Sequence, residues 1–177
     1  MRLKRKFYQQ SALKLAQALL GKVLARKIGR KKICAVITET EAYMGPHDKA
    51  SHSFGNKLTK RNWPMFLDGG CSYVYLVYGL HYQFNIVANH AGYPEAVLIR
   101  GIELANKSVA GPGRVTKYLK IGKELNAANL ANSKKIWLED RGFKIGKIKR
   151  EPRVGIDYAG SWAKKPWRFT ATIDKNQ

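Results

Sequence analysis

The sequence predicts an α+β fold: a single compact domain in which a curved, mainly antiparallel sheet is flanked by helices. Short runs rich in β-branched and aromatic residues recur along the chain, and two helical segments bracket them without regular alternation of strand and helix. No internal repeat, low-complexity linker or break in composition marks a second domain, and one domain is the expected number for 177 residues.

The N-terminal third predicts a basic arm, a helix and a pair of strands. Residues 1–10 form the arm, and the domain occupies 11–177. An amphipathic helix is expected over 11–20, with Ser11 suited to cap its start and Gly21 to stop it. Strands are expected at 22–28 and 33–41, joined by the basic turn "GRKK".

A polar loop over 44–64 separates these strands from the rest of the sheet. Three apolar runs follow it and predict strands, "CSYVYLVYG", "YQFNIVAN" and "EAVLIRGIEL". The Gly-Pro-Gly at 111–113 introduces a second helix over 114–125. The later segments "KIWLED", "RVGIDY" and "WRFTATI" predict further strands.

The charge balance indicates a polyanionic partner. Lys and Arg total 33 against 12 Asp and Glu, which gives a formal net charge of +21, and the first 33 residues contain eleven basic side chains and no acid. A generically basic soluble protein is the alternative. The hydrophobic content of 45% argues against a disordered basic tail.

Other features of the composition indicate a cytoplasmic protein, associated with the nucleoid in a prokaryote. The apolar runs at 74–77 and 96–99 are too short to span a bilayer, and the N-terminus lacks the apolar block of a secretory signal. Cys34 and Cys71 are too few for a zinc site by themselves and suit a reducing compartment. We interpret both as small buried residues.

The stretch "VITETEAY" places two carboxylates at the end of a strand. Because side chains alternate along a strand, Glu39, Glu41 and Tyr43 share one face. A carboxylate beside an aromatic ring at the end of a strand is typical of a functional site. The alternative is an exposed edge on which the glutamates pair with lysines.

A second cluster, "YVYLVYGLHYQFN", is rich in tyrosine. Aromatic rings among positive charges can stack nucleic-acid bases while the charges neutralise phosphates. The alternative is core packing, although a buried tyrosine needs a partner for its hydroxyl. By strand alternation, Tyr73 and Tyr75 are expected to face opposite to Tyr78. The cluster also contains Tyr82, His81 and Asn85.

Four segments, in order and at compatible spacing, resemble the alkyladenine (3-methyladenine) DNA glycosylase family. They are "TETEAYMGPHDKASHS", "YVYLVYGLHYQFNI", "AVLIRGIE" and "RVGIDYAGSWAKKPWRF", and the resemblance covers residues 11 to about 170. It implies a base-excision repair enzyme that flips an alkylated or deaminated purine out of double-stranded DNA and hydrolyses its N-glycosidic bond.

For catalysis, the resemblance implies that Glu41 is the general base and that Glu39 is supportive. A carboxylate near C1′ can activate water and stabilise the positive charge that develops on the sugar. Arg100 and the main-chain carbonyl of Val154 are implied to help Glu41 hold this water. No Lys or Cys nucleophile is marked, so the enzyme is expected to be monofunctional, without lyase activity, and to use no cofactor or metal.

For substrate binding, the resemblance implies an aromatic slot. Tyr43 and His52 sandwich the flipped base, Tyr75 packs on its edge, and backbone groups near Ala50 and His52 read its hydrogen-bonding face. Asn85 excludes normal guanine by a clash with its 2-amino group, and Tyr78 wedges into the minor groove. Expected duplex contacts are Thr59, Arg61, Leu80 and His81, where Leu80 replaces a methionine common in relatives. The protein is expected to act as a monomer.

Two other classes remain to be separated by experiment. A non-catalytic basic RNA- or DNA-binding protein would share the charge and the tyrosines, but it has no need of Glu41 in an aromatic pocket. A zinc nucleobase deaminase also flips bases, yet its H-x-E and P-C-x-x-C ligand set is absent from this sequence. The lesion preference among 3-methyladenine, 7-methylguanine, hypoxanthine and ethenoadenine stays open.

Overall fold

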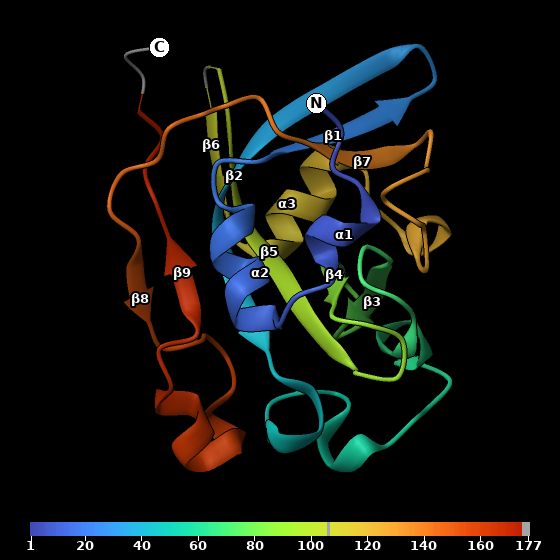
Figure 1. The fold of residues 1–177 in the computed structure, drawn as a ribbon, viewed down its shortest axis with the longest axis vertical. Helices are drawn as coiled ribbons and strands as arrows, with labels where there is room; N and C mark the ends of the chain where they lie inside the picture. Colours follow the sequence, from blue (N-terminus) through green and yellow to red (C-terminus); the bar gives the residue numbers. More distant parts are fainter. Residues whose placement is uncertain (106, 175–177) are drawn as a thin grey trace.

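The computed structural model describes residues 1–105 and 107–174 (Figure 1). Within them, nine strands form one sheet with the order β3-β4-β5-β2-β1-β7, to which β6, β8 and β9 are added through β5 and β2. All the strand pairs described are antiparallel, so the predicted α+β class with a mainly antiparallel sheet is confirmed. The strands are β1 Val23–Ile28, β2 Lys31–Tyr43, β3 Ser72–Val77, β4 His81–Ala88, β5 Glu95–Leu104, β6 Lys107–Ala110, β7 Ile136–Glu139, β8 Lys149–Glu151 and β9 Arg168–Thr170.

The first helices pack on the sheet. α1 spans Arg5–Tyr8 and α2 spans Ala12–Leu19, so the helix predicted at 11–20 is confirmed. Ser11 occupies the N-cap position without a side-chain cap, and the Ala12 N–H instead donates to Glu95 Oε2 at 2.7 Å. A carboxylate from β5 therefore satisfies the start of this helix, where negative charge is favoured.

The ten-residue segment expected as a basic arm is packed against the domain. Leu3 and Tyr8 belong to the main hydrophobic core, and the Leu3 N–H donates to the Leu138 carbonyl on β7 at 2.9 Å. Its apolar side chains therefore help to close the core, while its basic side chains add to the surface charge.

The second helix ends earlier than predicted. α3 spans Pro112–Leu119 and is followed by Lys120 with a positive φ of 48°. This left-handed residue breaks the helical path, and Leu125 lies instead in a separate 3₁₀ turn, η4 (Lys123–Leu125). Val115 and Leu119 still point into the core, as their helical spacing predicts.

Most of the predicted strands are present, but "RVGIDY" is not one. Its first residues form a loop that leads into the 3₁₀ segment η5 (Asp157–Lys164), because Arg153 is buried in ionic contacts and Gly155 has a φ of +75°. The short strands β6 and β8 were not predicted, since "KSVA" and "KRE" are too short and polar to stand out. Cys71 is buried as expected, whereas Cys34 is only half-buried.

The two faces of the sheet have different roles. Alternate residues of β2, β4 and β5, including Ala42, Phe84 and Val97, point into the core that α2 and α3 cover. The residues between them face the loop over 44–71, which contains the 3₁₀ turns η1 (Gly45–His47), η2 (Phe54–Asn56) and η3 (Trp63–Phe66). This loop and η5 lie together at the lower end of the sheet in Figure 1, where Ala50, Ile156 and Ala159 pack against one another.

Candidate active site

A pocket of about 340 Å³ opens on the sheet face opposite the helices, within the usual size range of small-ligand sites. The loop over 44–71, the β3–β4 hairpin and the segment that begins at Val154 surround it. The wall includes nine of the residues predicted for function: Tyr43, Ala50, His52, Arg61, Tyr75, Tyr78, Asn85, Arg100 and Val154.

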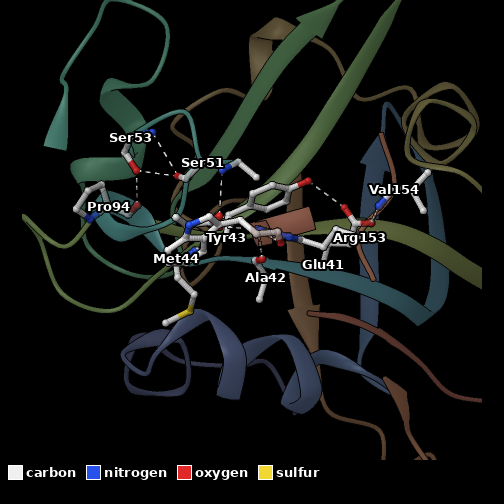
Figure 2. Close-up of polar contacts among 12 residues, drawn as sticks. Glu41, Ala42, Tyr43, Met44, Ser51, Ser53, Pro94, Arg153 and Val154 are labelled. Atoms are coloured by element: carbon white, nitrogen blue, oxygen red, sulfur yellow. Dashed lines mark hydrogen bonds and ion pairs between the residues drawn. The ribbon is translucent and has the colours of Figure 1, made fainter. Parts of the chain in front are cut away.

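Glu41 is fully buried directly behind this wall. Its Oε2 accepts a hydrogen bond from the Tyr43 hydroxyl at 2.9 Å, and its Oε1 accepts one from the Val154 N–H at 2.9 Å (Figure 2). Burial raises the pKa of Glu41 above its ordinary value, and the Arg100 charge and the Val154 N–H partly oppose this rise. The carboxyl group is thus held in one orientation and inclined to take up a proton.

Glu39 and Glu41 share Arg100, which confirms that they lie on one face of β2. The Arg100 Nε is 3.1 Å from Glu39 Oε1 and 3.4 Å from Glu41 Oε1. Arg168 on β9 also contacts Glu39, at 3.2 Å. The pairing of β2 with β5 is irregular here, because Thr38 and Arg100 have no paired residue on the other strand. The exposed-edge alternative is wrong, because β2 is paired with β1, β5 and β9 and Glu41 is fully buried.

Tyr43 forms one wall of the pocket. Its hydroxyl donates to Glu41, and the Arg153 guanidinium lies 4.8 Å from the centre of its ring. Burial, and next the charge of Glu41, raise the pKa of Tyr43 well above its usual value, so the phenol remains a donor. The ring therefore combines a fixed position with a hydroxyl that orients the carboxylate.

His52 forms a ring cluster with two tyrosines of β3. Its Nδ1 is 2.8 Å from the Tyr73 hydroxyl, and its ring centre lies 4.7 Å from that of Tyr75. Burial against these rings and the charge of Arg61 lower the pKa of His52 to about 4, although its open side faces solvent. A neutral imidazole is thus available at neutral pH for contact with a planar, electron-poor group.

The other predicted base-binding residues are held by internal bonds. Asn85 is buried and donates through Nδ2 to the Tyr73 carbonyl at 3.1 Å. The Ala50 N–H donates to Asp48 Oδ1, and the Ala50 carbonyl lies 3.4 Å from the Tyr158 hydroxyl. The Tyr75 hydroxyl donates to Gln83 at 2.6 Å. These bonds fix the shape of the pocket in the state described.

The β3–β4 hairpin carries Tyr78 to the pocket wall, and Leu80 and His81 follow it in the turn and at the start of β4. Tyr78 is 94% exposed, and Leu80 is 75% exposed. Tyr78 and Gly79 both have positive φ, and the Leu80 N–H donates to the Val77 carbonyl at 3.0 Å, as in a type I′ turn. The alternation argument for Tyr78 does not apply, because Tyr78 lies in this turn beyond the end of β3.

The predicted duplex contacts fall into two groups. Arg61 lies at the pocket, with its guanidinium 4.9 Å from the centre of the Tyr75 ring. Thr59 is instead engaged with Asn62, whose Oδ1 accepts from the Thr59 N–H and whose Nδ2 donates to the His52 carbonyl. Thr59 and Asn62 therefore shape the loop that presents His52.

Sequence reasoning missed the ion pair between Asp48 and Arg153, whose side chains are both fully buried. It also missed Tyr73 as the partner of His52 and Tyr158 as a wall residue. The segments "GPHDKA" and "EPRVG" contain these charges without any pattern that pairs them, since 105 residues separate the two. Only the motif in which each lies could have drawn attention to them.

Among the residues described, no three His, Cys, Asp or Glu side chains gather in a way that could hold a metal ion. Over the same residues, no helix has both the length and the apolar character needed to cross a bilayer.

A strongly basic α+β domain that joins an aromatic pocket to a buried carboxylate is of the class that acts on the bases of nucleic acids. The family model described as methylpurine-DNA glycosylase (MPG) matches residues 6–175. The chain belongs to this family of DNA-repair glycosylases.

Individual relatives match over nearly their whole length. A protein of Borreliella burgdorferi (strain ZS7), named "Putative 3-methyladenine DNA glycosylase", is 43% identical over 93% of this chain and 93% of its own. Proteins of the same name from Desulfitobacterium hafniense (strain Y51) and Methanocella arvoryzae are 42% and 40% identical. They cover 95% and 98% of this chain, and 94% and 92% of their own length.

Proposed function

We propose that this protein is a monofunctional DNA glycosylase that binds double-stranded DNA as a monomer, flips an alkylated or deaminated purine into the pocket, and hydrolyses its N-glycosidic bond. The observation that carries the proposal is the position of Glu41, fully buried behind a wall made by Tyr43, Arg100 and Val154. A non-catalytic binding module has no need of a carboxylate fixed in this way.

The chemistry follows from this carboxylate. Glu41 accepts a proton from a water molecule while the water oxygen forms a bond to C1′, and the C1′–N bond breaks with its electron pair leaving on the base. Each carboxylate oxygen has a lone pair beyond the one bonded to Tyr43 or Val154. A cationic alkylpurine leaves as a neutral base, whereas hypoxanthine needs a proton to do so. The alkylpurine is therefore the better leaving group.

The pocket and the hairpin serve base flipping in this proposal. Tyr43 and His52 stack on the extruded base, Tyr75 borders it, and Asn85 limits the room beside its edge. Tyr78, exposed at the mouth, fills the space that the nucleotide leaves and offsets the unstacking energy of a few kcal/mol. Arg61, Thr59, Leu80 and His81 are the proposed duplex contacts.

The test is single-turnover excision from oligonucleotides that each carry one lesion: 3-methyladenine, 7-methylguanine, hypoxanthine or ethenoadenine. Glu41→Gln keeps the size of the side chain but removes the base, so we expect lesion-DNA binding to persist and the rate to fall at least about 10²-fold. Glu39→Gln is the control and is expected to lose less, because Glu39 acts through Arg100.

Near-normal excision by Glu41→Gln would contradict its role as the base. Wild-type protein that binds nucleic acid but releases no base would instead favour the binding-module alternative. Strand cleavage at the abasic product without added alkali would contradict the monofunctional assignment.

A further inference from the structure

A fully buried ion pair lies beside the pocket and has no part in the chemistry proposed above. Arg153 donates through both terminal nitrogens to Asp48, at 2.5 and 2.8 Å, and the side chains of both residues are 0% exposed. Two charges held away from water require good geometry to persist, and a bidentate pair provides it. Arg153 precedes Val154, and Asp48 precedes the Ala50–His52 loop.

The Arg153 side of the pair contacts the end of β2 and a tryptophan ring. Its NH1 donates to the Ala42 carbonyl on β2 at 3.0 Å (Figure 2). Its guanidinium lies 4.8 Å from the Tyr43 ring centre and 5.0 Å from the Trp167 ring centre. One face of Tyr43 is thus covered by a planar cation, while the same ring lines the pocket.

The Asp48 side of the pair fixes the pocket loop. Asp48 accepts hydrogen bonds from the Met44 N–H at 3.1 Å and from the Ala50 N–H at 3.0 Å. A carboxylate with four donors in this way sets the backbone of the turn that leads to His52. The pair therefore joins the end of β2, the loop that carries His52 and the segment that carries Val154.

We propose that Asp48 and Arg153 are the positioning residues of this glycosylase: together they hold the Tyr43 ring and place the Val154 N–H that orients Glu41. The inference rests on the proposed function, and it concerns geometry, since neither side chain lines the pocket. A shift of about 1 Å in catalytic groups can lower a rate about 10²-fold, so a pair remote from the substrate can control catalysis.

The first test separates the geometry of Arg153 from its charge. Arg153→Lys keeps the charge but lacks the planar fork of two nitrogens that bonds Asp48 and covers the Tyr43 ring. We expect single-turnover excision of hypoxanthine to fall about 10²-fold. The acidic limb of its pH profile should move to higher pH as far as the loss of the Val154 hydrogen bond to Glu41 moves it. The positive charge of Arg153 also lowers the pKa of Glu41 in the native site. Arg153→Gln removes this charge as well, so we expect a similar loss of rate and an acidic limb moved further to higher pH than in Arg153→Lys.

The acidic limb of the pH profile depends on the pKa of Glu41, and therefore on all the charged and titratable groups around it. The charged and titratable groups that face it or its partners are Glu39 and Tyr43 on β2, Tyr75 on β3, Arg100 on β5, Arg153, and Arg168 on β9. Because Arg153→Gln changes only one of these groups, its limb is compared directly with that of Arg153→Lys.

Arg26→Lys is the matched control. Arg26 is also buried and donates to the carbonyls of Leu119, Lys27, Lys135 and Lys120, but it does not line the pocket. We expect it to lower the melting temperature while the rate per folded molecule and the pH profile stay as in the wild type.

If the single variants do not fold, Asp48→Asn combined with Arg153→Gln removes both charges together and leaves neither one buried without a partner. A folded single or double variant with the wild-type rate and pH profile would overturn the positioning role. A wild-type protein that releases no base would instead overturn the proposed function, so the two failures are distinguishable.

Discussion

At the scale of single residues, the site moves the pKa values of two titratable groups away from their ordinary values. Burial raises the pKa of Glu41, and burial lowers that of His52 to about 4. In the proposed function, a raised pKa lets Glu41 hold an abstracted proton more firmly, and a neutral His52 does not repel a cationic base. Burial of Glu41 opposes the charge that a carboxylate carries in water at neutral pH, whereas burial of His52 opposes its charge only below about pH 6.5.

The shift of His52 predicts a pH dependence of stability. Its folded pKa of about 4 lies below the unfolded value near 6.5, so between these values the unfolded chain takes up a proton that the native chain does not. The contribution of His52 to the free energy of unfolding is therefore fully present above pH 6.5 and is lost as the pH falls toward 4. We expect His52→Gln to show a smaller loss of unfolding free energy between pH 7 and pH 4.5.

Urea denaturation at both pH values checks this expectation. His90→Gln, which removes an exposed histidine from a loop outside the pocket, is the control for the substitution itself. The same pH dependence in His52→Gln as in the wild type would show that His52 does not stay neutral in the folded protein.

At the scale of elements, the β3–β4 hairpin accepts an unfavourable residue in its turn. Both central positions of the turn have positive φ, a conformation that suits Asn or Gly, yet the first position is Tyr78 with a φ of 49°. The 94% exposed ring gains little from burial. A bulky residue kept in a strained, exposed turn at a pocket mouth is consistent with the proposed wedge role.

The hairpin therefore predicts opposite effects on stability and activity. Tyr78→Asn relieves the backbone strain and is expected to raise the unfolding free energy by about 1 kcal/mol. It also removes the wedge, so excision of hypoxanthine should fall most when the base is paired with cytosine, less opposite thymine, and least in single-stranded DNA.

Single-turnover rates on the three substrates, compared with Tyr78→Ala and the wild type, measure this order. Tyr93→Ala removes another exposed tyrosine outside the pocket and should leave the ratios unchanged. Equal loss on all three substrates would place Tyr78 in base binding rather than in flipping.

At the scale of the whole molecule, a formal charge of +21 acts on any polyanion. The sheet turns one face to the helices and the other to the pocket, so the groups proposed to be catalytic are carried by strands rather than by loops alone. Glu41 and Arg100 in particular lie on the paired strands β2 and β5. In the proposed function, the charge attracts the nucleic acid and the sheet holds in place the groups that act on it.

This charge predicts salt-sensitive binding. For undamaged duplex DNA, log K should fall linearly with log salt, with a slope of about −0.9 for each phosphate contacted. Arg61→Gln should make the slope shallower by about one contact if its guanidinium meets a phosphate. Fluorescence anisotropy from 50 to 200 mM salt gives the slope, and salt-insensitive binding by the wild type would contradict the polyanion interpretation.

The sequence by itself determined the features that depend on neighbours along the chain. The alternation of side chains placed Glu39, Glu41 and Tyr43 on one face of a strand, and apolar runs located β3, β4 and β5. Both follow from consecutive residues, because side chains in a strand alternate with a period of two. The family resemblance also named nine of the residues that line the pocket, including His52 and Val154.

Only the tertiary structure decided the features that depend on residues far apart. Asp48 meets Arg153 across 105 residues, Glu95 rather than Ser11 satisfies the start of α2, and Arg153 keeps "RVGIDY" out of the sheet. Patterns among neighbouring residues do not encode such contacts, because the contacts form only after the chain has folded and excluded water from them. The burial that raises the pKa of Glu41 arises in the same way, from side chains that the fold brings together.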